Sequence, residues 1–341
     1  MRVLVCNADE QGCGFYRMME PARVLADAGH DIILDPYAST IRCKTDLAGQ
    51  VLWAQADADV AVFQRPMSRD GESLIRALQA NGTRVVVELD DDLWNLERTH
   101  VMYAQNRPSS DKLHHVGYLS DCLRAADLVT VSTPALARLI PNPNVRILYN
   151  MIPEWYLTCE PDYGEGWSAT DGRQTVVWAG LPGLHAGDLR VVKDGVRRTV
   201  RASGTVFVGM GDPDIGPQLG FADGEALWSP FVPLDVYPKA LKCHDFGIVP
   251  LKDNLFNRSK SYLKGLEYAA LGIPFVASPL PEYRRLASHG VGLLAKDHEW
   301  GRVLAKLIRD PEDQREAGLA FARQNTYERN AWRWLEAWTS N

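Results

Sequence analysis

The residues from 256 to 278 combine basic, acidic and hydroxyl side chains in a pattern that could perform polar chemistry. If a helix begins near Ser261, its first turn presents unpaired N–H groups, and Arg258, Lys260 and Lys264 add positive charge beside them. Such an arrangement could hold a diphosphate. Glu267 shares the helical face of the two lysines, so its carboxylate could accept both hydroxyls of a ribose. A solvated helix face that makes ordinary salt bridges is the structural alternative.

A run of three carboxylates, Asp90 to Asp92, follows a predicted strand near the middle of the first half. Either Asp91 or Asp92 is expected to orient a substrate hydroxyl, or to act as a general base. A run of aspartates could also bind Mg²⁺, but alternate side chains at a strand end diverge, and we expect no metal site. Capping of the next helical turn is the structural alternative for these residues.

Glycine-containing loops follow two other predicted strands. Gly12 and Gly14 come after the first strand of the chain, with Arg17 close behind, and Gly180 comes after the first strand of the second half. His185 lies in the second loop, where it could contact a phosphate or polarise a leaving group. A tight turn before a helix would explain the first loop without a ligand, and surface exposure would explain the histidine.

Short strands rich in Val and Ile alternate with helical patterns along the chain, and this alternation predicts parallel sheets covered on both faces. In the first half the expected strands are 2–6, 32–34, 60–63, 84–89, 128–131 and 145–148, and the expected helices are 16–28, 74–80 and 119–126. In the second half the expected strands are 175–179, 205–208, 246–249 and 274–277, and the expected helices are 188–200, 262–271, 300–308 and 311–324.

The chain has 341 residues, more than the roughly 250 to 300 that one hydrophobic core usually supports. A stretch from 153 to 174 contains Pro and Gly without sustained periodicity, and we interpret it as the interdomain connection. We therefore expect an α/β fold with two Rossmann-like domains, 1–155 and 172–325, that face a cleft. The tail 326–341 is expected to form a tryptophan-rich helix that crosses back to the first domain. Ligands of such sheets lie outside the carboxyl ends of the strands.

Composition excludes several classes of protein. Lys and Arg total 37 against 43 Asp and Glu, so no global positive field attracts nucleic acid, and any DNA contact must be local. The six cysteines lie far apart without a C-x-x-C pair, which argues against a disulfide framework or a thiolate zinc site and favours a reducing cytoplasm. The first apolar run is too short for a signal peptide, and no window approaches the roughly 20 apolar residues of a membrane span.

The segment from Phe256 to Ser278 resembles the donor-binding signature of GT-B glycosyltransferases, in particular their retaining Glu-x7-Glu branch. The match is close from Glu267 to Ser278, E-Y-A-A-L-G-I-P-F-V-A-S. The resemblance implies that Glu267 binds the ribose of a nucleotide sugar and that Lys260 and Lys264 face its diphosphate. The first glutamate of the pair would fall at Ser259, so the pair is incomplete here.

Two further stretches carry the resemblance. The Gly12-Cys-Gly14 loop, followed by Arg17, is similar to the N-terminal glycine loop that approaches the transferred sugar and phosphates in these enzymes. The F-N-R-S-K-S run, which contains Asn257, Arg258 and Ser259, looks like that of phage-encoded transferases. The resemblance therefore implies a donor site that includes these residues, with UDP-sugar as the expected donor and no other cofactor.

The expected function is transfer of a sugar from a nucleotide sugar to an acceptor hydroxyl, without a metal and with retention. The acceptor is left open between DNA, protein and glycan. One alternative is a DNA glycosyltransferase that acts on hydroxymethylated pyrimidines, because the basic helix 190–201 could form a groove for a polyanion. A solvated outer face is the favoured structural explanation for this helix. A non-catalytic nucleotide-sugar-binding module and an epimerase of the same fold are further alternatives. The expected location is the cytoplasm, that of a host cell if a phage encodes the chain.

Overall fold

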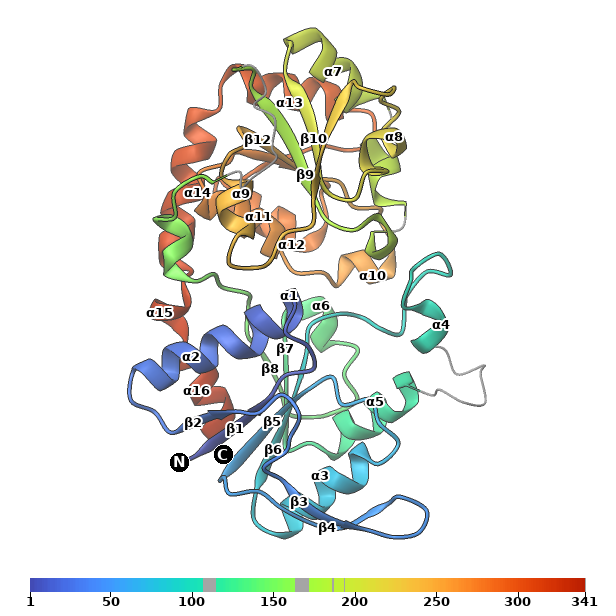
Figure 1. The fold of residues 1–341 in the computed structure, drawn as a ribbon, viewed down its shortest axis with the longest axis vertical. Helices are drawn as coiled ribbons and strands as arrows, with labels where there is room; N and C mark the ends of the chain where they lie inside the picture. The colour runs from blue at the N-terminus through green and yellow to red at the C-terminus, as the bar shows by residue number, and fades with distance from the viewer. Residues whose placement is uncertain (107–114, 163–171, 186, 193, 341) are drawn as a thin grey trace.

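The structure is a computed structural model that describes residues 1–106, 115–162, 172–185, 187–192 and 194–340. Part of the predicted interdomain connection, and Lys193 of the predicted basic helix, lie outside these residues. Figure 1 shows two α/β domains stacked along the long axis of the molecule, with α1, α6 and α10 at the junction between them. Within the part of the chain described, none of the helices has the length and apolar character needed to cross a bilayer.

Six parallel strands form the sheet of the first domain, in the order β2-β1-β5-β6-β7-β8. The strands are β1 (Val3–Cys6), β2 (Ile32–Leu34), β5 (Val60–Gln64), β6 (Arg84–Leu89), β7 (Leu128–Val131) and β8 (Val145–Ile147). Successive side chains of β1 point to opposite faces: Val3 and Val5 join the core beneath α2 and α16, and Leu4 joins the core beneath α3 and α5. Continuous apolar strands of this kind follow from burial on both faces.

The remaining elements of the first domain cover this sheet or extend from it. The helical elements are α1 (Gly12–Gly14), a π-helical turn η1 (Phe15–Met19), α2 (Glu20–Asp27), α3 (Gly71–Ala80), α4 (Tyr103–Asn106), α5 (His115–Ala125) and α6 (Pro134–Ala137). An antiparallel hairpin, β3 (Arg42–Thr45) and β4 (Val51–Gln55), packs beside α3. A short 3-10 turn, η2 (Glu154–Leu157), begins the connection to the second domain.

The second domain repeats the arrangement with a parallel sheet in the order β11-β10-β9-β12-β13-β14. Its strands are β9 (Thr175–Ala179), β10 (Val206–Gly211), β11 (Ala226–Pro230), β12 (Phe246–Val249), β13 (Phe275–Ala277) and β14 (Leu293–Leu294). Its helical elements are η3 (Pro182–Leu184), η4 (Asp188–Val192), α7 (Gly195–Ser203), α8 (Ile215–Gln218), α9 (Tyr237–Leu241), α10 (Leu255–Arg258), α11 (Leu263–Ala270), α12 (Pro281–Ser288), α13 (Trp300–Arg309) and α14 (Glu312–Gln324).

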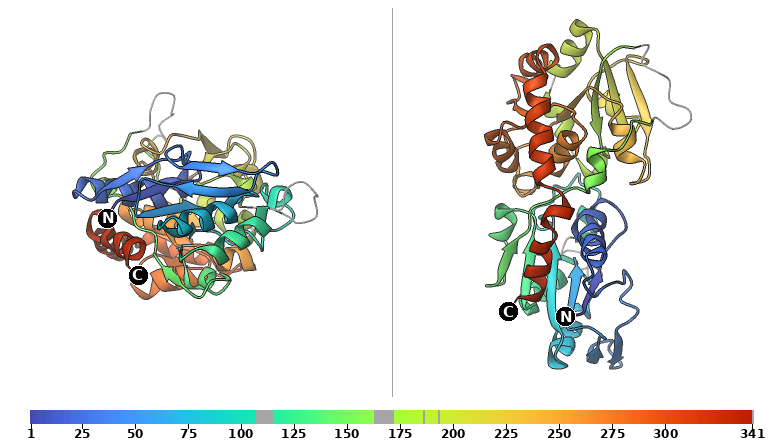
Figure 2. Two further views of the ribbon diagram at one scale, coloured as in Figure 1. Left: turned by 90° about the horizontal axis from the view of Figure 1, so that it is seen from below. Right: turned by 90° about the vertical axis from the view of Figure 1, so that its left-hand side faces the viewer.

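The chain returns to the first domain through α15 (Tyr327–Asn330) and α16 (Trp332–Thr339), which run down one side of the molecule (Figure 2). The two crossings lie side by side: the Ile152 amide donates to Asn325 O at 3.1 Å, and the Tyr327 amide donates to Ile152 O at 2.9 Å. Trp334 and Trp338 of α16 are completely buried against the first sheet. The predicted two-domain α/β fold with a crossing C-terminal helix is confirmed.

Some predicted elements were wrong in extent. The helix expected from Tyr16 begins at Gly12, and its first turns include the π-helical η1, because both glycines lie in helical rather than loop conformation. The helix expected over 188–200 is split into η4 and α7. The hairpin β3–β4, the strand β11 and the helix α12 were not predicted. β3 is exposed throughout, and the other three short segments mix exposed and buried positions.

Candidate active site between the domains

A cavity of about 540 Å³ lies between the two domains, outside the carboxyl ends of β1, β6, β9 and β10. Its first-domain wall includes Gln11, Gly12, Cys13, Tyr16, Arg17, Asp90, Asp91 and Asn150. Its second-domain wall includes Gly180, His185, Met210, Phe231, Val232, Leu234, Tyr237, Lys260, Ser261, Lys264, Glu267 and Tyr283. The cavity is therefore built where paired parallel sheets are expected to bind a ligand.

The structure brings most of the predicted site residues to this cavity. Those that line it are Gly12, Arg17, Asp91, Gly180, His185, Lys260, Lys264 and Glu267. Those that do not line it are Gly14, Asp92, Asn257, Arg258 and Ser259. The residues that do not line the cavity contact other parts of the protein instead, as described below.

Glu267 and Lys264 lie on α11, whose apolar positions pack beneath the second sheet. Glu267 is 6% exposed, and its carboxylate accepts hydrogen bonds from Tyr16 Oη at 2.7 Å and Tyr237 Oη at 3.2 Å. Burial raises the pKa of Glu267, and the nearby Lys264 ammonium opposes that rise. Lys264 Nζ donates to Ala179 O at 2.5 Å, and burial lowers the pKa of this lysine. An anion beside Lys264 would restore the preference for its charged form.

Lys260 stands between the domains. Its Nζ lies 3.8 Å from Asp91 Oδ1 and 4.4 Å from the centre of the Phe256 ring. The residue lies between α10 and α11, and the helix predicted over 262–271 begins at Leu263. The side chain is only 18% exposed, and a charge held there in reduced solvent acts strongly on an anion in the cavity.

His185 is neutral at physiological pH. Burial is the largest effect on its ring and lowers its pKa to about 4, although the nearby carboxylate of Asp188 acts in the opposite direction. His185 Nδ1 lies 3.1 Å from Asp188 Oδ2, so an ionised Asp188 holds the proton on Nδ1 and leaves Nε2 as an acceptor. A neutral imidazole in this tautomer suits a sugar hydroxyl better than a phosphate.

Asn257 acts on His185 indirectly, through Asp188. It is 3% exposed, and its Nδ2 donates to Asp188 Oδ1 at 2.7 Å and to Lys252 O at 2.9 Å. The Lys252 amide donates to the same Asp188 oxygen at 2.8 Å. These bonds fix the carboxylate that orients His185, which makes Asn257 a positioning residue.

Arg17 is held in a buried ion pair. Its Nε donates to Glu88 Oε1 at 2.6 Å, and its Nη1 donates to Leu148 O at 2.5 Å and to Asn150 Oδ1 at 2.7 Å. The side chain is 1% exposed, and only Nη2 lacks a partner among the described residues. Most of its N–H groups therefore donate to protein atoms, and the bonds to Leu148 and Asn150 connect the first helix to the segment that leads into the second domain.

The two predicted aspartates divide between structure and cavity. Asp92 is 1% exposed, and its carboxylate accepts from the Asn95 amide at 3.2 Å and from Asn95 Nδ2 at 2.8 Å. These bonds close a turn after β6, and the described residues form no helix between β6 and α4. Asp92 therefore has a local structural role but does not cap a helix, as the alternative had expected. Asp91 lines the cavity and faces Lys260, so it is the aspartate placed to meet a ligand.

Asp91 also belongs to a small group of potential metal ligands. Ligand atoms of Cys13, Asp90 and Asp91 lie within 4.8 Å of one another. Arg65 lies beside this group, with Nε 3.9 Å from Asp90 Oδ1, and it also pairs with Asp9. A fixed guanidinium at that distance opposes a divalent cation electrostatically.

The other residues outside the cavity have structural partners. Arg258 is exposed and pairs with Asp253 at 2.5 Å on the outer surface. Ser259 O accepts from Thr133 Oγ1 at 2.8 Å, which ties α10 to the first domain. A Cβ on Gly14 would come within 1.7 Å of Asp9 O, so this glycine permits close packing, whereas a Cβ on Gly12 would meet no protein atom within 4 Å. Gly12 therefore leaves room for a ligand.

The basic helix lies far from the cavity. Figure 1 places α7 and α13 at the end of the second domain opposite the junction. Arg198, Arg302, Arg309 and His298 line a separate depression of about 610 Å³ between these helices, and Arg197 and Arg201 are paired with Asp194 and Glu225. The predicted cluster on helix 190–201 thus does not extend the wall of the interdomain cavity.

Two tyrosines of the site were not predicted from the sequence. Tyr16 lies between the glycine loop and Arg17 but has the spacing of a core helix residue, and Tyr237 follows a Pro-rich loop without a motif. Their hydroxyls donate to Glu267 because the fold places η1 of the first domain and α9 of the second domain next to α11. The adjacency of Tyr16 to the glycine loop was the one available signal.

Comparisons with known proteins agree with this architecture. HepE from Anabaena, solved in complex with UDP, superposes with a TM-score of 0.62 at 12% identity over 99% of this chain and 100% of that chain. WaaG, a glycosyltransferase involved in lipopolysaccharide biosynthesis, gives 0.59 at 12% identity over the whole of both chains. The pneumococcal O-GlcNAc transferase GtfA, in complex with UDP and GlcNAc, gives 0.56 at 11% identity over 81% of this chain, which spans only 56% of the length of GtfA.

No protein-family model matches the sequence. No curated protein sequence matches it either. Likeness at this level of identity establishes the fold, which is GT-B, as the resemblance at residues 256–278 implied.

Proposed function

We propose that this chain of GT-B fold is a glycosyltransferase that binds a nucleotide sugar in the interdomain cavity and transfers its sugar to an acceptor hydroxyl. One observation carries the proposal: Lys260, Lys264 and the buried Glu267, which were predicted from their spacing together with the resemblance, line one wall of that cavity together. Two ammonium groups beside a carboxylate match the alternation of diphosphate and ribose along a nucleoside diphosphate. UDP bound to HepE and to GtfA supports a UDP-sugar as the donor.

The electrostatic task of the site is to stabilise the departing nucleoside diphosphate. Lys260 is held more loosely than Lys264: its Nζ lies 3.8 Å from Asp91 Oδ1, beyond hydrogen-bond distance, whereas Lys264 Nζ donates to Ala179 O at 2.5 Å. Lys264 lies deeper and gains its charge most readily when an anion is present. Together they supply the positive charge that other transferases take from a metal ion, so we propose transfer without a metal.

The donor sugar would lie between the two loops that follow β1 and β9. Gly12 leaves space there, Gly180 lines the cavity, and His185 Nε2 offers an acceptor for a sugar hydroxyl. The apolar side chains of Phe231, Val232 and Leu234 form a wall suited to the base.

The acceptor would approach from the first domain, where Asp90 and Asp91 line the cavity. In the transfer the bond from sugar C1 to the diphosphate oxygen breaks, and a bond from C1 to the acceptor oxygen forms. Asp91 orients the acceptor hydroxyl, and in a retaining reaction the departing diphosphate accepts its proton. The resemblance at Glu267–Ser278 supports retention, and the anomeric signal of the product in NMR distinguishes it from inversion.

Charge at the cavity favours a neutral acceptor over DNA. The acceptor side carries carboxylates, and the basic helices α7 and α13 lie at the remote end of the second domain. Like charges disfavour a phosphate backbone beside Asp90 and Asp91. We propose a glycan or protein hydroxyl as acceptor. Binding to hydroxymethylated duplex with a steep negative salt dependence would contradict this.

The test of the proposed function is donor turnover. Incubation with UDP-, GDP- and ADP-sugars should release free nucleotide from one of them slowly without acceptor. Lys260→Ala and Glu267→Ala should each abolish release while circular dichroism stays that of the unaltered protein. Full activity in both variants contradicts the proposal. Binding of the intact donor without any release or transfer supports a non-catalytic module instead, and conversion of the donor's own sugar supports an epimerase.

A further inference from the structure

The carboxylate expected to bind ribose is already the centre of a tyrosine cluster. Glu267 Oε1 accepts from Tyr16 Oη at 2.7 Å, and Oε2 accepts from Tyr237 Oη at 3.2 Å. Glu267 belongs to the second domain, and so does Tyr237. Tyr16 comes from the first domain, and the Tyr16–Glu267 bond therefore spans the cavity wall from one domain to the other.

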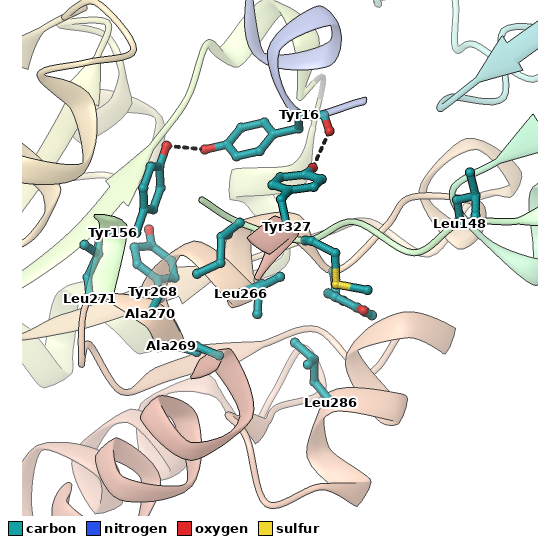
Figure 3. Close-up of a cluster of buried hydrophobic side chains, with 14 of the residues drawn as sticks. Tyr16, Leu148, Tyr156, Leu266, Tyr268, Ala269, Ala270, Leu271, Leu286 and Tyr327 are labelled. Atoms are coloured by element: carbon teal, nitrogen blue, oxygen red, sulfur yellow. Dashed lines mark hydrogen bonds between the residues drawn. The ribbon is translucent and has the colours of Figure 1, made fainter. Parts of the chain in front are cut away.

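Tyr16 is held in place by residues that lie between the domains. Its hydroxyl is 2.6 Å from that of Tyr156 in η2, and its carbonyl oxygen accepts from the Tyr327 hydroxyl of α15, as Figure 3 shows. The residue lies in the π-helical turn η1, a rare geometry that occurs often at functional sites. The position of the phenol is thus specified from three sides.

The direction of the hydrogen bonds in this cluster follows from proton counting. An ionised carboxylate only accepts, so the single proton of Tyr16 goes to Glu267, and Tyr156 must donate to Tyr16. If Tyr16 lost its bond to Glu267, the tyrosine pair could reverse and Tyr16 could donate to Tyr156. The Tyr16 hydroxyl would then remain bonded after it left the carboxylate.

We propose that the Tyr16 hydroxyl and a hydroxyl of the donor ribose compete for Glu267 Oε1, so that Tyr16 sets the affinity for nucleotides that carry a ribose diol. The inference rests on the proposed function, in which Glu267 receives the ribose. Tyr16 and Glu267 both line the cavity, and Glu267 is 6% exposed, so a ligand that approaches the carboxylate meets the phenol at the same oxygen.

Competition has a measurable consequence for binding. Breaking the Tyr16–Glu267 bond offsets part of the free energy gained from the ribose–carboxylate bond. The observed affinity for a ribonucleotide is therefore lower than it would be if Glu267 had no hydrogen bond from Tyr16. A nucleotide without ribose hydroxyls gains nothing from the carboxylate and does not need to displace Tyr16. The difference between these two ligands isolates the role of Tyr16.

The experiment measures calorimetric affinities of the full chain for a nucleoside diphosphate and its 2′,3′-dideoxy analogue. The nucleotide is whichever of UDP, GDP and ADP the unaltered protein binds tightest. Tyr16→Phe should strengthen ribonucleotide binding by about threefold or more relative to the dideoxy analogue, since a hydrogen bond to a charged acceptor no longer has to be broken. Tyr156→Phe is the matched control, because it leaves the Tyr16–Glu267 bond in place and should not strengthen binding.

The outcomes separate the inference from the proposed function. If the unaltered protein prefers the ribonucleotide but Tyr16→Phe leaves that preference unchanged or reduces it, the inference is wrong and the proposed function stands. If the unaltered protein binds no nucleotide, the proposed function is wrong and the inference is wrong with it. If neither the unaltered protein nor Tyr16→Phe distinguishes ribose from dideoxyribose, Glu267 does not bind the ribose and the inference alone is wrong. If Tyr16→Phe does not fold, a crystal structure of the unaltered protein with the nucleotide decides: Tyr16 Oη should lie beyond about 3.5 Å from Glu267 Oε1, and a retained bond overturns the inference.

Discussion

Single residues of the site differ in charge state because they differ in burial. The pKa of His185 is lowered to about 4, below the ordinary histidine value of 6.5, because the ring is desolvated. An unfolded chain therefore binds this proton at a higher pH than the folded chain does. The contribution to stability is complete above pH 6.5 and is lost as the pH falls toward 4.

The first prediction concerns this linkage. His185→Gln should make the free energy of unfolding less dependent on pH between 6.5 and 4, by up to about 1.4 kcal/mol per pH unit. Chemical denaturation at several pH values measures the slope. His30→Gln, a substitution of an exposed histidine, is the comparison, and an equal change of slope in both variants would show that burial of His185 is not the cause.

Adjacent aspartates provide the second prediction. Asp92→Ala removes the acceptor of two Asn95 bonds and should lower the free energy of unfolding by about 1 kcal/mol or more. Asp91→Ala should instead leave unfolding nearly unchanged and reduce transfer to the acceptor at least about tenfold. Denaturation and steady-state kinetics are measured on both variants. A loss of stability in Asp91→Ala together with a loss of transfer but not of stability in Asp92→Ala would contradict the prediction.

Residue types, spacing and the resemblance at residues 256–278 together were enough to predict Lys260, Lys264, Glu267, Asp91 and His185 as cavity residues. Spacing could not separate Asp91 from Asp92, because that depends on which way the chain turns after β6. It could not reveal Tyr16 and Tyr237 either, since their hydroxyls meet Glu267 through contacts between distant segments.

At the scale of elements, α16 stabilises the first domain from a distance in sequence. Trp334 and Trp338 are fully buried against the first sheet, and Trp332 on the opposite face is 54% exposed. Alternation of this kind is what an amphipathic helix requires, and it explains why the tail could be predicted to pack back on the first domain.

The third prediction uses that alternation. Trp338→Ala should lower the free energy of unfolding by about 3 to 5 kcal/mol, because it removes a buried indole from a packed core. Trp332→Ala should change it by less than about 0.5 kcal/mol. Urea denaturation of the two variants measures the contrast, and similar losses in both would mean that α16 is not docked as described.

Element prediction succeeded for short runs rich in Val, Ile and Leu and failed for segments of mixed composition. The strands β6 and β7 have the predicted limits, because each contains a short run rich in Val and is bounded by turn residues. The hairpin β3–β4 was not predicted because β3 is fully exposed and β4 alternates in only a few residues. The 3-10 and π turns depend on tertiary contacts that no local pattern carries.

At the scale of the whole molecule, a side chain of the second domain joins the core of the first. Phe256 of α10 is 5% exposed within the cluster that holds α3 and α5, and its ring meets His100 edge-on at 5.2 Å. Lys252 pairs with Glu97 at 2.7 Å, and Asn150 Nδ2 donates to Ser261 Oγ at 2.7 Å. These contacts hold the two walls of the cavity together.

The fourth prediction follows from this docking. Phe256→Ala should separate the domains, which X-ray scattering would record as a larger radius of gyration, and should weaken nucleotide binding because Lys260 loses its position over the ring. Leu255→Ala, at the adjacent residue with 60% exposure, is the matched control and should do neither. An unchanged radius in the Phe256 variant would contradict the role given to α10.

The central claim is that Lys260 and Lys264 hold a nucleoside diphosphate in the interdomain cavity, and direct binding measures it best. Calorimetry with UDP, GDP and ADP should find one that binds, with Lys260→Ala weakening that binding at least about tenfold, as loss of a charge-assisted contact requires. Arg258→Ala, which removes an exposed cation of the same segment paired to Asp253, should leave binding unchanged. Failure of all three nucleotides to bind, or equal losses in the two variants, would contradict the claim.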